Sequence, residues 1–414
     1  MRILIVTYVF PPLNAIGSHR PYSWARTWRD LGHEIDVLTV AKHSFDGAMD
    51  LERDMTGIRV HEVPYLPVAR ESSPAGSKVA RWEKLKAITR RVRFSMGIFG
   101  DPRLLAYLPM VRRGAALCVK RSFDFIIATS PPEVPFMVAR TLSRRARIPW
   151  IADFRDLWFQ DMLLYRSKLA SWLSGPLNRW LVNDAALLVT VSRGLEGRLS
   201  NYLGREVFVS YNGFFADEDE AQTIPHSDGK LHIIYTGRLY PGKQDPEPLI
   251  QALGKLRANI ADLPQRLTLD VYGFDAPWFR SLVDRNGVQD CVTMHGFVPY
   301  RQSRGAQRSA DLLLFIDWIE TRTGGMLTGK LFEYLGSGRP ILAIGPTKDS
   351  EAAKIIAESG CGATLTKVDE IFDYLKLFSS SPPLGVPLGA VKEYTRERQA
   401  EKLLTAIEQR LPSS

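Results

Sequence analysis

Residues 324–346 read "GGMLTGKLFEYLGSGRPILAIGP", and this stretch can be interpreted in two incompatible ways. From Gly324 to Lys330 it matches G-x-x-x-x-G-K, the beginning of a P-loop that holds the phosphates of ATP. A P-loop continues with Ser or Thr, which binds magnesium, but the next residue here is Leu331. The glycines therefore belong either to a defective ATPase loop or to a different site that also needs glycines before a helix.

The size and composition of the chain limit its class. Its 414 residues suit two sizeable domains, and 45% hydrophobic with 24% charged residues is typical of a globular protein. No apolar run approaches the roughly 20 residues of a membrane helix, and "MRILIVTYVFPP" at the start has a strand pattern, not that of a signal peptide. Cys118, Cys291 and Cys361 lie far apart, without metal-ligand spacing. We therefore expect a cytoplasmic protein with reduced thiols.

Strand-like apolar segments alternate with helical patterns along almost the whole chain. Such alternation implies parallel, doubly wound sheets, and two series of strands flank a polar, acidic stretch at 214–230. Two Rossmann-like domains are therefore predicted, followed by a helix at 394–411. The expected strands lie within 2–10, 34–40, 58–65, 123–133, 149–158, 186–192 and 207–214, and then within 231–239, 267–273, 292–298, 311–317, 340–346 and 362–366.

Unusual loops follow several of these strands. In doubly wound sheets, ligands bind beyond the carboxyl ends of the strands. "FPPLNAIGSHR" follows the first strand, "TGRLYPGK" opens the second series, and "TRTGGMLTGK" follows "DLLLFIDW". No complete G-x-G-x-x-G follows the first strand, because Gly17 stands alone. A nicotinamide-dependent dehydrogenase is therefore disfavoured.

Three blocks of the second half carry a family resemblance. "YTGRLYPGK", "VYG" with "HGFVPY", and "TGKLFEYLGSGRPILAIG" resemble the nucleotide-sugar-binding domain of retaining glycosyltransferases of family 4. "ADFRDLW" and "YNGF" look like the bacterial surface-polysaccharide branch of that family. The resemblance implies an α/β GT-B fold, with two Rossmann-like domains facing across a cleft. It makes 1–213 the acceptor-side domain, 214–390 the nucleotide-sugar domain, and 391–414 a terminal helix that packs back on the first. It also assigns the glycines before Lys330 to a sugar-diphosphate loop.

Arg238 and Lys243 are the expected catalytic cations. The leaving diphosphate of a nucleotide sugar gains negative charge, which fixed cations and backbone N–H groups stabilise most in the transition state. Both residues lie at the carboxyl end of a strand, among Gly237 and Gly242, and they suit this role without a metal ion or another cofactor. The alternative is that both are solvated surface charges.

The glycine loop and the helix after it supply the other expected donor contacts. Backbone N–H groups at a helix start attract anions. In the family pattern one glutamate begins this loop and a second lies eight positions later; Glu333 matches the second and would bind ribose hydroxyls. The first falls on Gly325, so backbone groups replace it or the donor sugar lacks the usual hydroxyls. The expected donor loop is Gly325, Met326, Leu327 and Thr328.

"HGFVPY" resembles the site where the family holds the base. The implied contacts come from backbone groups near Phe297 and Val298, and the alternative for Phe297 is an ordinary core position.

The N-terminal half offers further candidates. Gly17 and Ser18 would let the backbone approach the diphosphate, and Arg20 would add charge. Many relatives carry a histidine at a strand end that contacts the sugar, but the comparable place here reads "ADFRDLW". Asp153 and Asp156 are therefore candidates to steady a cationic sugar or to take the acceptor proton. The alternative is an Asp–Arg pair that only fixes the loop.

The net charge of +9 comes from one window. Residues 78–121 hold twelve Lys and Arg residues against Glu83 and Asp101, and 77–100 has the pattern of a basic amphipathic helix. We expect this window to bind an anionic membrane surface; the alternative is a helix packed on its own core. Nucleic acid is an improbable partner, because helix-turn-helix, zinc and RNP signatures are lacking.

Together these features predict a retaining, metal-independent glycosyltransferase. It would move a sugar from a nucleotide-diphosphate sugar, with UDP favoured, to a saccharide that we expect to be lipid-linked, in polysaccharide biosynthesis at the inner face of the cell membrane. The alternatives on the same architecture are a nucleotide-sugar epimerase and a pseudo-glycosyltransferase that joins non-sugar rings.

Overall fold

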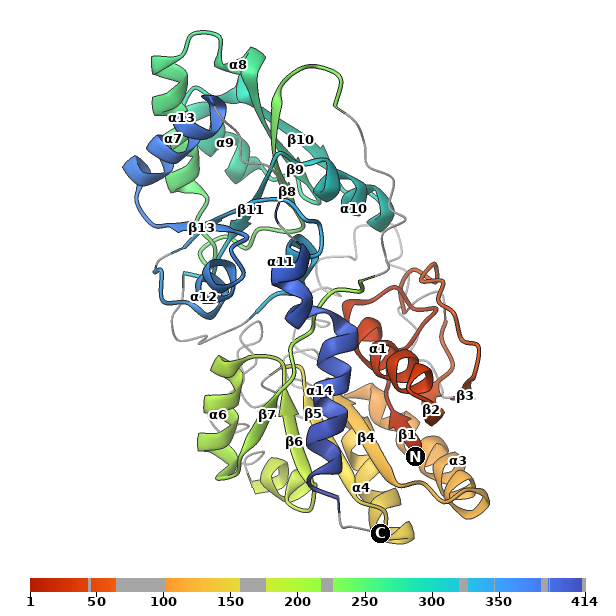
Figure 1. The fold of residues 1–414 in the computed structure, drawn as a ribbon. Coiled ribbons are helices and arrows are strands. Elements are labelled where there is room, and N and C mark those ends of the chain that lie inside the picture. Colours follow the sequence, from red (N-terminus) through yellow and green to blue (C-terminus); the bar gives the residue numbers. More distant parts are fainter. Residues whose placement is uncertain are drawn as a thin grey trace, which may run out of the picture. The chain divides into compact units, whose positions relative to one another are not determined.

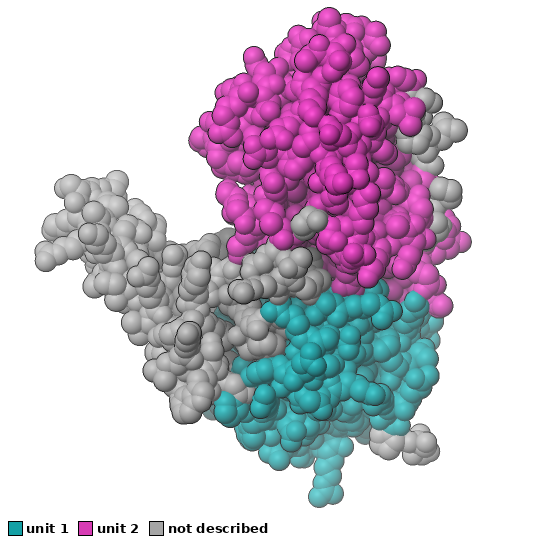
Figure 2. Space-filling view, turned by 90° about the vertical axis from the view of Figure 1, so that its left-hand side faces the viewer, with its two compact units in different colours: residues 1–211, 400–414 teal, residues 212–399 magenta. Residues whose placement is uncertain are grey.

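The computed structural model divides into two compact units, coloured separately in Figure 2. Unit 1 is Met1–Tyr211 with Ala400–Ser414, and unit 2 is Asn212–Gln399. The first division lies two residues from the expected boundary after Gly213, and the chain returns to unit 1 at Ala400, not at residue 391. The residues described are 1–43, 46–64, 101–156, 176–216, 226–319, 327–345, 347–380, 386 and 388–411.

Unit 1 is built on a 7-stranded sheet with the order β3-β2-β1-β4-β5-β6-β7 (Figure 1). All of its strand pairs are parallel, and the order reverses direction beside β1, as in a doubly wound Rossmann-like fold. The predicted α/β class is confirmed. The strands are β1 Arg2–Val6, β2 Glu34–Val40, β3 Ile58–Val63, β4 Phe125–Ser130, β5 Trp150–Phe154, β6 Leu187–Thr190 and β7 Val207–Val209.

Helices cover both faces of this sheet. Strand residues are buried on both sides, so the strands read as continuous apolar runs. Trp28 of α1 packs edge-on against Phe125 on one face, with ring centroids 6.0 Å apart, and α3 and α4 pack on the other. The described helices are α1 Ile16–Asp30, η2 Pro102–Ala106, α3 Tyr107–Lys120, α4 Val134–Ala146, α6 Arg193–Leu203 and α14 Arg396–Glu408.

The last helix, α14, completes unit 1 beside α1. The Trp28 indole N–H donates to the carbonyl of Ala400 (3.0 Å). Leu403 and Ile407 are buried, and Arg410 pairs with Glu206 ahead of β7 at 2.7 Å. The end of the chain is therefore part of the core of unit 1.

Unit 2 has a 6-stranded sheet with the order β10-β9-β8-β11-β12-β13, again parallel. Helices α7, α9 and α13 cover one face, while α10 and α11 pack on the other (Figure 1). The strands are β8 Leu231–Thr236, β9 Leu267–Tyr272, β10 Val292–Gly296, β11 Leu312–Ile316, β12 Ile341–Ile344 and β13 Gly362–Leu365. The helices are α7 Glu247–Asn259, α8 Leu263–Arg266, α9 Pro277–Arg285, η3 Gln289–Cys291, α10 Tyr300–Ser309, α11 Gly329–Leu335, α12 Glu351–Glu358, α13 Val368–Ser380 and η5 Leu388–Tyr394.

The expected basic helix at 77–100 lies outside the described residues, as do Gly325 and Met326. Of the basic window, 101–121 is described and forms η2 and α3. In the described ranges, no helix combines the length and apolarity needed to cross a bilayer.

A buried ion pair ties α1 to the centre of the unit 1 sheet. Arg20 donates to both oxygens of Asp153 on β5, with a shortest distance of 2.7 Å, and the two side chains are 2% and 0% exposed. Thr129 on β4 donates to the same carboxylate (2.7 Å), and the remaining Arg20 donor reaches the carbonyls of Ser210 (2.9 Å) and Tyr211 (3.2 Å). The expected roles of Asp153 in catalysis and of Arg20 at the diphosphate are therefore corrected, because both groups are enclosed and fully engaged. An Asp–Arg pair does form, but with Arg20 instead of the neighbouring Arg155.

We predict that Asp153→Asn lowers the free energy of unfolding by about 3–5 kcal/mol, because it leaves the Arg20 guanidinium buried without a counter-charge. The matched control is Asp156→Asn, three residues later and exposed, which should change stability by less than about 0.5 kcal/mol. Urea unfolding followed by tryptophan fluorescence measures both. Equal unfolding midpoints for the two variants would show that the pair does not hold unit 1 together.

Candidate active site

At the carboxyl edge of the unit 2 sheet, three glycines leave the backbone without side chains, and we call these three residues the glycine floor. Gly237 follows β8, Gly273 follows β9 and Gly296 ends β10, with φ angles of +98°, +103° and +66°. The N–H of Gly237 donates to Tyr272 O (2.8 Å), and that of Gly273 donates to Gly296 O (2.6 Å). A Cβ on Gly273 would lie 2.9 Å from the backbone of Gly237. These positions therefore require glycine, and the missing side chains let a ligand approach the strand ends closely.

Arg238 and Lys243 stand on the loop that leaves β8 at this edge. Arg238 is exposed, and its carbonyl accepts a hydrogen bond from the Tyr235 hydroxyl (3.0 Å). The Lys243 N–H donates to Tyr240 O (3.0 Å), and its carbonyl accepts from the N–H of Ile319 (2.8 Å). The loop backbone is thus fixed at both cations. The structure places these two residues on one loop at the carboxyl end of β8.

Glu333 lies on α11 and is held by a buried glutamine. One carboxylate oxygen accepts from Gln307 on α10 (3.1 Å), whose amide also donates to the Thr236 hydroxyl (2.9 Å). Arg304 donates to the Gln307 side chain (2.6 Å) and to the Glu333 carbonyl (2.9 Å). Within the described part of the chain the other Glu333 oxygen accepts no hydrogen bond. A half-buried carboxylate with one oriented, available oxygen suits the binding of hydroxyl groups.

Gln307, Arg304 and Thr236 were not predicted as site residues. Arg304 and Gln307 are three residues apart on α10 and both are buried, so they lie on the helix face that packs on the sheet. The available sequence signal was this pair of polar residues at helical spacing in a segment that adjoins a strand.

Lys330 is a further polar residue at this edge of the sheet. The sequence indicated no role for it once a P-loop was rejected. Its amine donates to the Tyr235 hydroxyl (2.6 Å) and lies 3.8 Å from the centre of that ring. It is also packed beside Gly237, because a Cβ there would meet Lys330 Nζ at 3.2 Å. Burial lowers the pKa of Lys330 to about 7, and burial raises the pKa of Tyr235 well above its ordinary value.

The other predicted donor residues of unit 2 occupy varied environments. Leu327 is buried, and Thr328 takes the N-cap position of α11 with its carbonyl accepting from Leu331 N–H (3.2 Å). Phe297 is 90% exposed, so the alternative of a core position is wrong. Val298 beside it is partly exposed. The structure thus leaves an exposed aromatic ring directly after β10.

In unit 1, Gly17 and Arg155 are packed together at the start of α1. A Cβ on Gly17 would overlap the Arg155 guanidinium, which bonds to the carbonyls of Ser130 and Pro131. Burial lowers the pKa of Arg155. Ser18 is fully buried and its N–H donates to Ala15 O (2.8 Å), so its predicted backbone contact with a diphosphate does not fit. Of the two aspartates, Asp156 alone is exposed.

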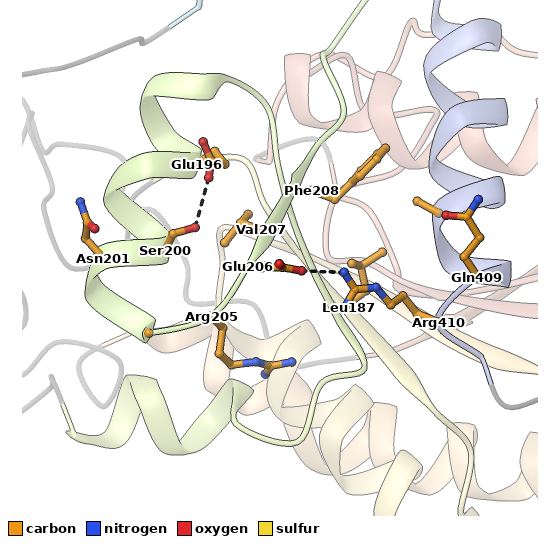
Figure 3. A pocket seen from close by; sticks show the side chains of 12 residues that line it. Leu187, Glu196, Ser200, Asn201, Arg205, Glu206, Val207, Phe208, Gln409 and Arg410 are labelled. Carbon is orange, nitrogen blue, oxygen red and sulfur yellow. Dashed lines mark hydrogen bonds and ion pairs between the residues drawn. The ribbon is translucent and has the colours of Figure 1, made fainter.

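A groove of about 560 Å³ lies in unit 1 between α6 and α14, over β7 (Figure 3). Leu187 and Val207 begin β6 and β7, so the groove lies at the amino ends of these strands, opposite the edge where doubly wound folds bind ligands. Two pairs of polar side chains in its lining interact with each other, Glu206 with Arg410 and Ser200 with Glu196. The groove therefore lies away from the strand edge that carries Arg238 and Lys243. The groove is lined by Leu187, Glu196, Ser200, Asn201, Gly204, Arg205, Glu206, Val207, Phe208, Ala406, Gln409 and Arg410.

Among the described residues, no group of three or more His, Cys, Asp or Glu side chains is arranged to hold a metal ion.

Part of the N-terminal half is similar to a known domain. Residues 18–213 match the model of the glycosyl transferase 4-like domain. No curated protein sequence matches the chain.

Solved structures resemble the chain over its whole length. HepE of Anabaena, in complex with UDP, has a TM-score of 0.62 at 16% identity, over 99% of this chain and 100% of HepE. Sucrose-phosphate synthase of Thermosynechococcus elongatus has a TM-score of 0.62 at 13% identity, covering 99% and 98% of the two chains. The lipopolysaccharide outer core galactosyltransferase WaaB has a TM-score of 0.57 at 14% identity, covering 99% and 100%. The chain therefore carries a glycosyl transferase 4-like domain at residues 18–213 and has the fold of GT-B glycosyltransferases.

Proposed function

We propose that the chain is a glycosyltransferase that takes a sugar from a nucleotide-diphosphate sugar, with UDP as the favoured nucleotide. The observation that carries this proposal is the pair Arg238 and Lys243 on one fixed loop, beside the glycine floor at the carboxyl edge of the unit 2 sheet. HepE was solved with UDP, with UDP and glucose, and with UDP-glucose, which supports the choice of nucleotide.

The proposed mechanism is stabilisation of the leaving diphosphate. As the bond between the sugar and the diphosphate breaks, negative charge grows on the diphosphate, and Arg238 and Lys243 stabilise that charge more than the ground state. Glu333 accepts hydrogen bonds from ribose hydroxyls through its available oxygen, and Phe297 offers an aromatic face to the base. Because Asp153 is buried in its pair with Arg20, exposed Asp156 is the proposed carboxylate that takes the acceptor proton.

Nucleotide-sugar epimerisation and pseudo-glycosyl transfer remain the alternatives on this fold. The epimerase changes the donor without an acceptor, whereas both transferases release nucleotide only as the acceptor is consumed. Measuring UDP release from UDP-sugar donors with and without acceptor separates epimerase from transferase, and identification of the ring in the product separates the two transferases.

We predict that Arg238→Ala and Lys243→Ala each lower kcat by about thirty- to a thousandfold, because each removes one stabiliser worth roughly 2–4 kcal/mol. The matched control is Lys255→Ala, an exposed lysine of α7 that pairs with Asp369. Circular dichroism checks that all three variants are folded. Wild-type kcat in both test variants at saturating donor would refute the assignment.

We further propose that transfer retains the anomeric configuration of the donor and needs no divalent cation. Retention follows from the family resemblance alone, and metal independence follows from the proposed use of two side-chain cations in place of a metal ion. NMR of the fresh product should show an unchanged anomeric coupling, and activity should persist in EDTA. An inverted coupling, or activity that returns only on addition of magnesium or manganese, would contradict the corresponding half of this prediction.

The acceptor is proposed to be a lipid-linked saccharide at the cytoplasmic face of a membrane, in polysaccharide biosynthesis. The excess of positive charge in 78–121 supports this, since each Lys or Arg near an anionic surface contributes about 1 kcal/mol. In the described part of the window, Arg112, Arg113 and Lys120 of α3 are exposed.

We predict that the protein floats with liposomes in proportion to their anionic lipid content at low salt. Changing Lys84, Lys86, Arg90, Arg91 and Arg93 to Gln should abolish flotation. The matched control changes five exposed basic residues of unit 2 to Gln and should still float. Failure of the wild type to float, or equal flotation of both variants, would exclude the membrane role. The control residues are Arg285, Arg301, Lys354, Lys367 and Lys376.

A further inference from the structure

The side chain of Lys330 is half-buried, its amine is desolvated, and within the described residues no carboxylate pairs with it. Its hydrogen-bond partner is the neutral Tyr235 hydroxyl at 2.6 Å, and the same ring lies 3.8 Å below it. Glu333 acts on it electrostatically, but within the described residues the amine forms no ion pair. A cation in this position is costly unless a negative charge is brought to it.

Two buried cations elsewhere in the chain are satisfied by groups of the protein itself. Arg20 is bound by Asp153 and two carbonyls, and Arg304 is bound by the Gln307 side chain and the Glu333 carbonyl. Lys330 differs from both, because its packing against Gly237 places it directly behind the loop that carries Arg238. Its charge is therefore available to an anion at the glycine floor.

We propose that Lys330 binds the diphosphate of the donor and of the released nucleotide as an ammonium ion, and that their binding draws a proton onto this amine. This inference rests on the proposed function and adds a third cation, with a different behaviour, to Arg238 and Lys243. The Tyr235 hydroxyl, which accepts from the amine, holds it in place while it is neutral or charged.

The expected uptake of a proton follows from the protonation state of Lys330 in the protein without ligand. Burial lowers the pKa of Lys330 to about 7, so above neutral pH most of the free protein carries a neutral amine. A bound diphosphate favours the charged form and raises this pKa. Below about pH 7 the amine is already protonated, so affinity is independent of its titration. Above pH 7, affinity falls by up to about tenfold per pH unit until the pKa of the complex is reached.

The other ionisable groups around the Lys330 amine do not account for a fall in affinity above pH 7. Tyr235 on β8 and Tyr334 on α11 have pKa values that burial raises well above the tested range. Glu333 on α11 is the acid that acts on Lys330, and Arg238 on the adjoining loop is a permanent cation. Above pH 7 a terminal phosphate is itself ionised, since its second pKa is about 6.

The test is isothermal titration calorimetry of the full chain with UDP at pH 7, 8 and 9, each in two buffers of different ionisation enthalpy. The wild type should bind UDP more weakly as the pH rises and should take up a proton at pH 8. Lys330→Met should bind about ten- to a hundredfold more weakly at pH 7, with no proton uptake. Lys330→Arg keeps a permanent charge, so it should bind UDP without proton uptake.

Two controls separate the possible failures. Lys354→Met, an exposed lysine of α12, should behave as wild type, and uridine should bind wild type and Lys330→Met equally. UDP binding that is equally tight and equally pH-dependent in Lys330→Met overturns the role of Lys330 and leaves the proposed function standing. Absence of binding of UDP, GDP and their sugars to the wild type overturns the proposed function, and this inference with it. Thermal unfolding confirms that each variant is folded.

Discussion

Parallel pairing of the strands is the constraint on which both units depend. Because neighbouring strands run in the same direction, their carboxyl ends meet at one edge, and segments far apart in the sequence are brought together there. In unit 2 this edge collects the loop after β8, the glycines after β9 and at the end of β10, and the start of α11. The proposed site therefore combines one cationic loop, the three glycines and the start of one helix at a single edge of the sheet.

The fold was predictable from the sequence because its periodicity is strong. Continuous apolar runs bounded by turn residues gave the strands of both sheets, and α1 and α14 followed from helical spacing. Arg238, Lys243 and Glu333 were chosen from local motifs at a strand end and on one helix, and their roles stay predictions. Asp153 was misassigned for a physical reason: its partner Arg20 lies 133 residues away, and no local pattern shows that the two meet in the core. Lys330 was overlooked because the sequence suggested only one role for it, that of a P-loop lysine, and the P-loop motif is incomplete in this chain.

Three buried cations illustrate how the partner decides the role. The planar guanidinium of Arg20 matches a carboxylate and two carbonyls, so it fixes α1 on the sheet. Arg304 uses its donors to orient Gln307, which in turn orients Glu333. Among the described residues, the Lys330 amine donates only to the Tyr235 phenol oxygen, and a lysine can lose its proton where an arginine cannot. The same burial that makes arginine structural makes this lysine responsive to its ligand.

The return of the chain to unit 1 at Ala400 also sets the order in which the protein can be completed during synthesis. Unit 2 is one continuous segment, Asn212–Gln399, whereas unit 1 lacks its last helix until the end of the chain emerges. Trp28 and Ala400 are 372 residues apart, which corresponds to roughly 20 to 75 seconds of translation at about 5–20 residues per second. During that interval the face of α1 that α14 will cover has no partner from this chain. The unit whose synthesis begins first is thus the one that is completed last.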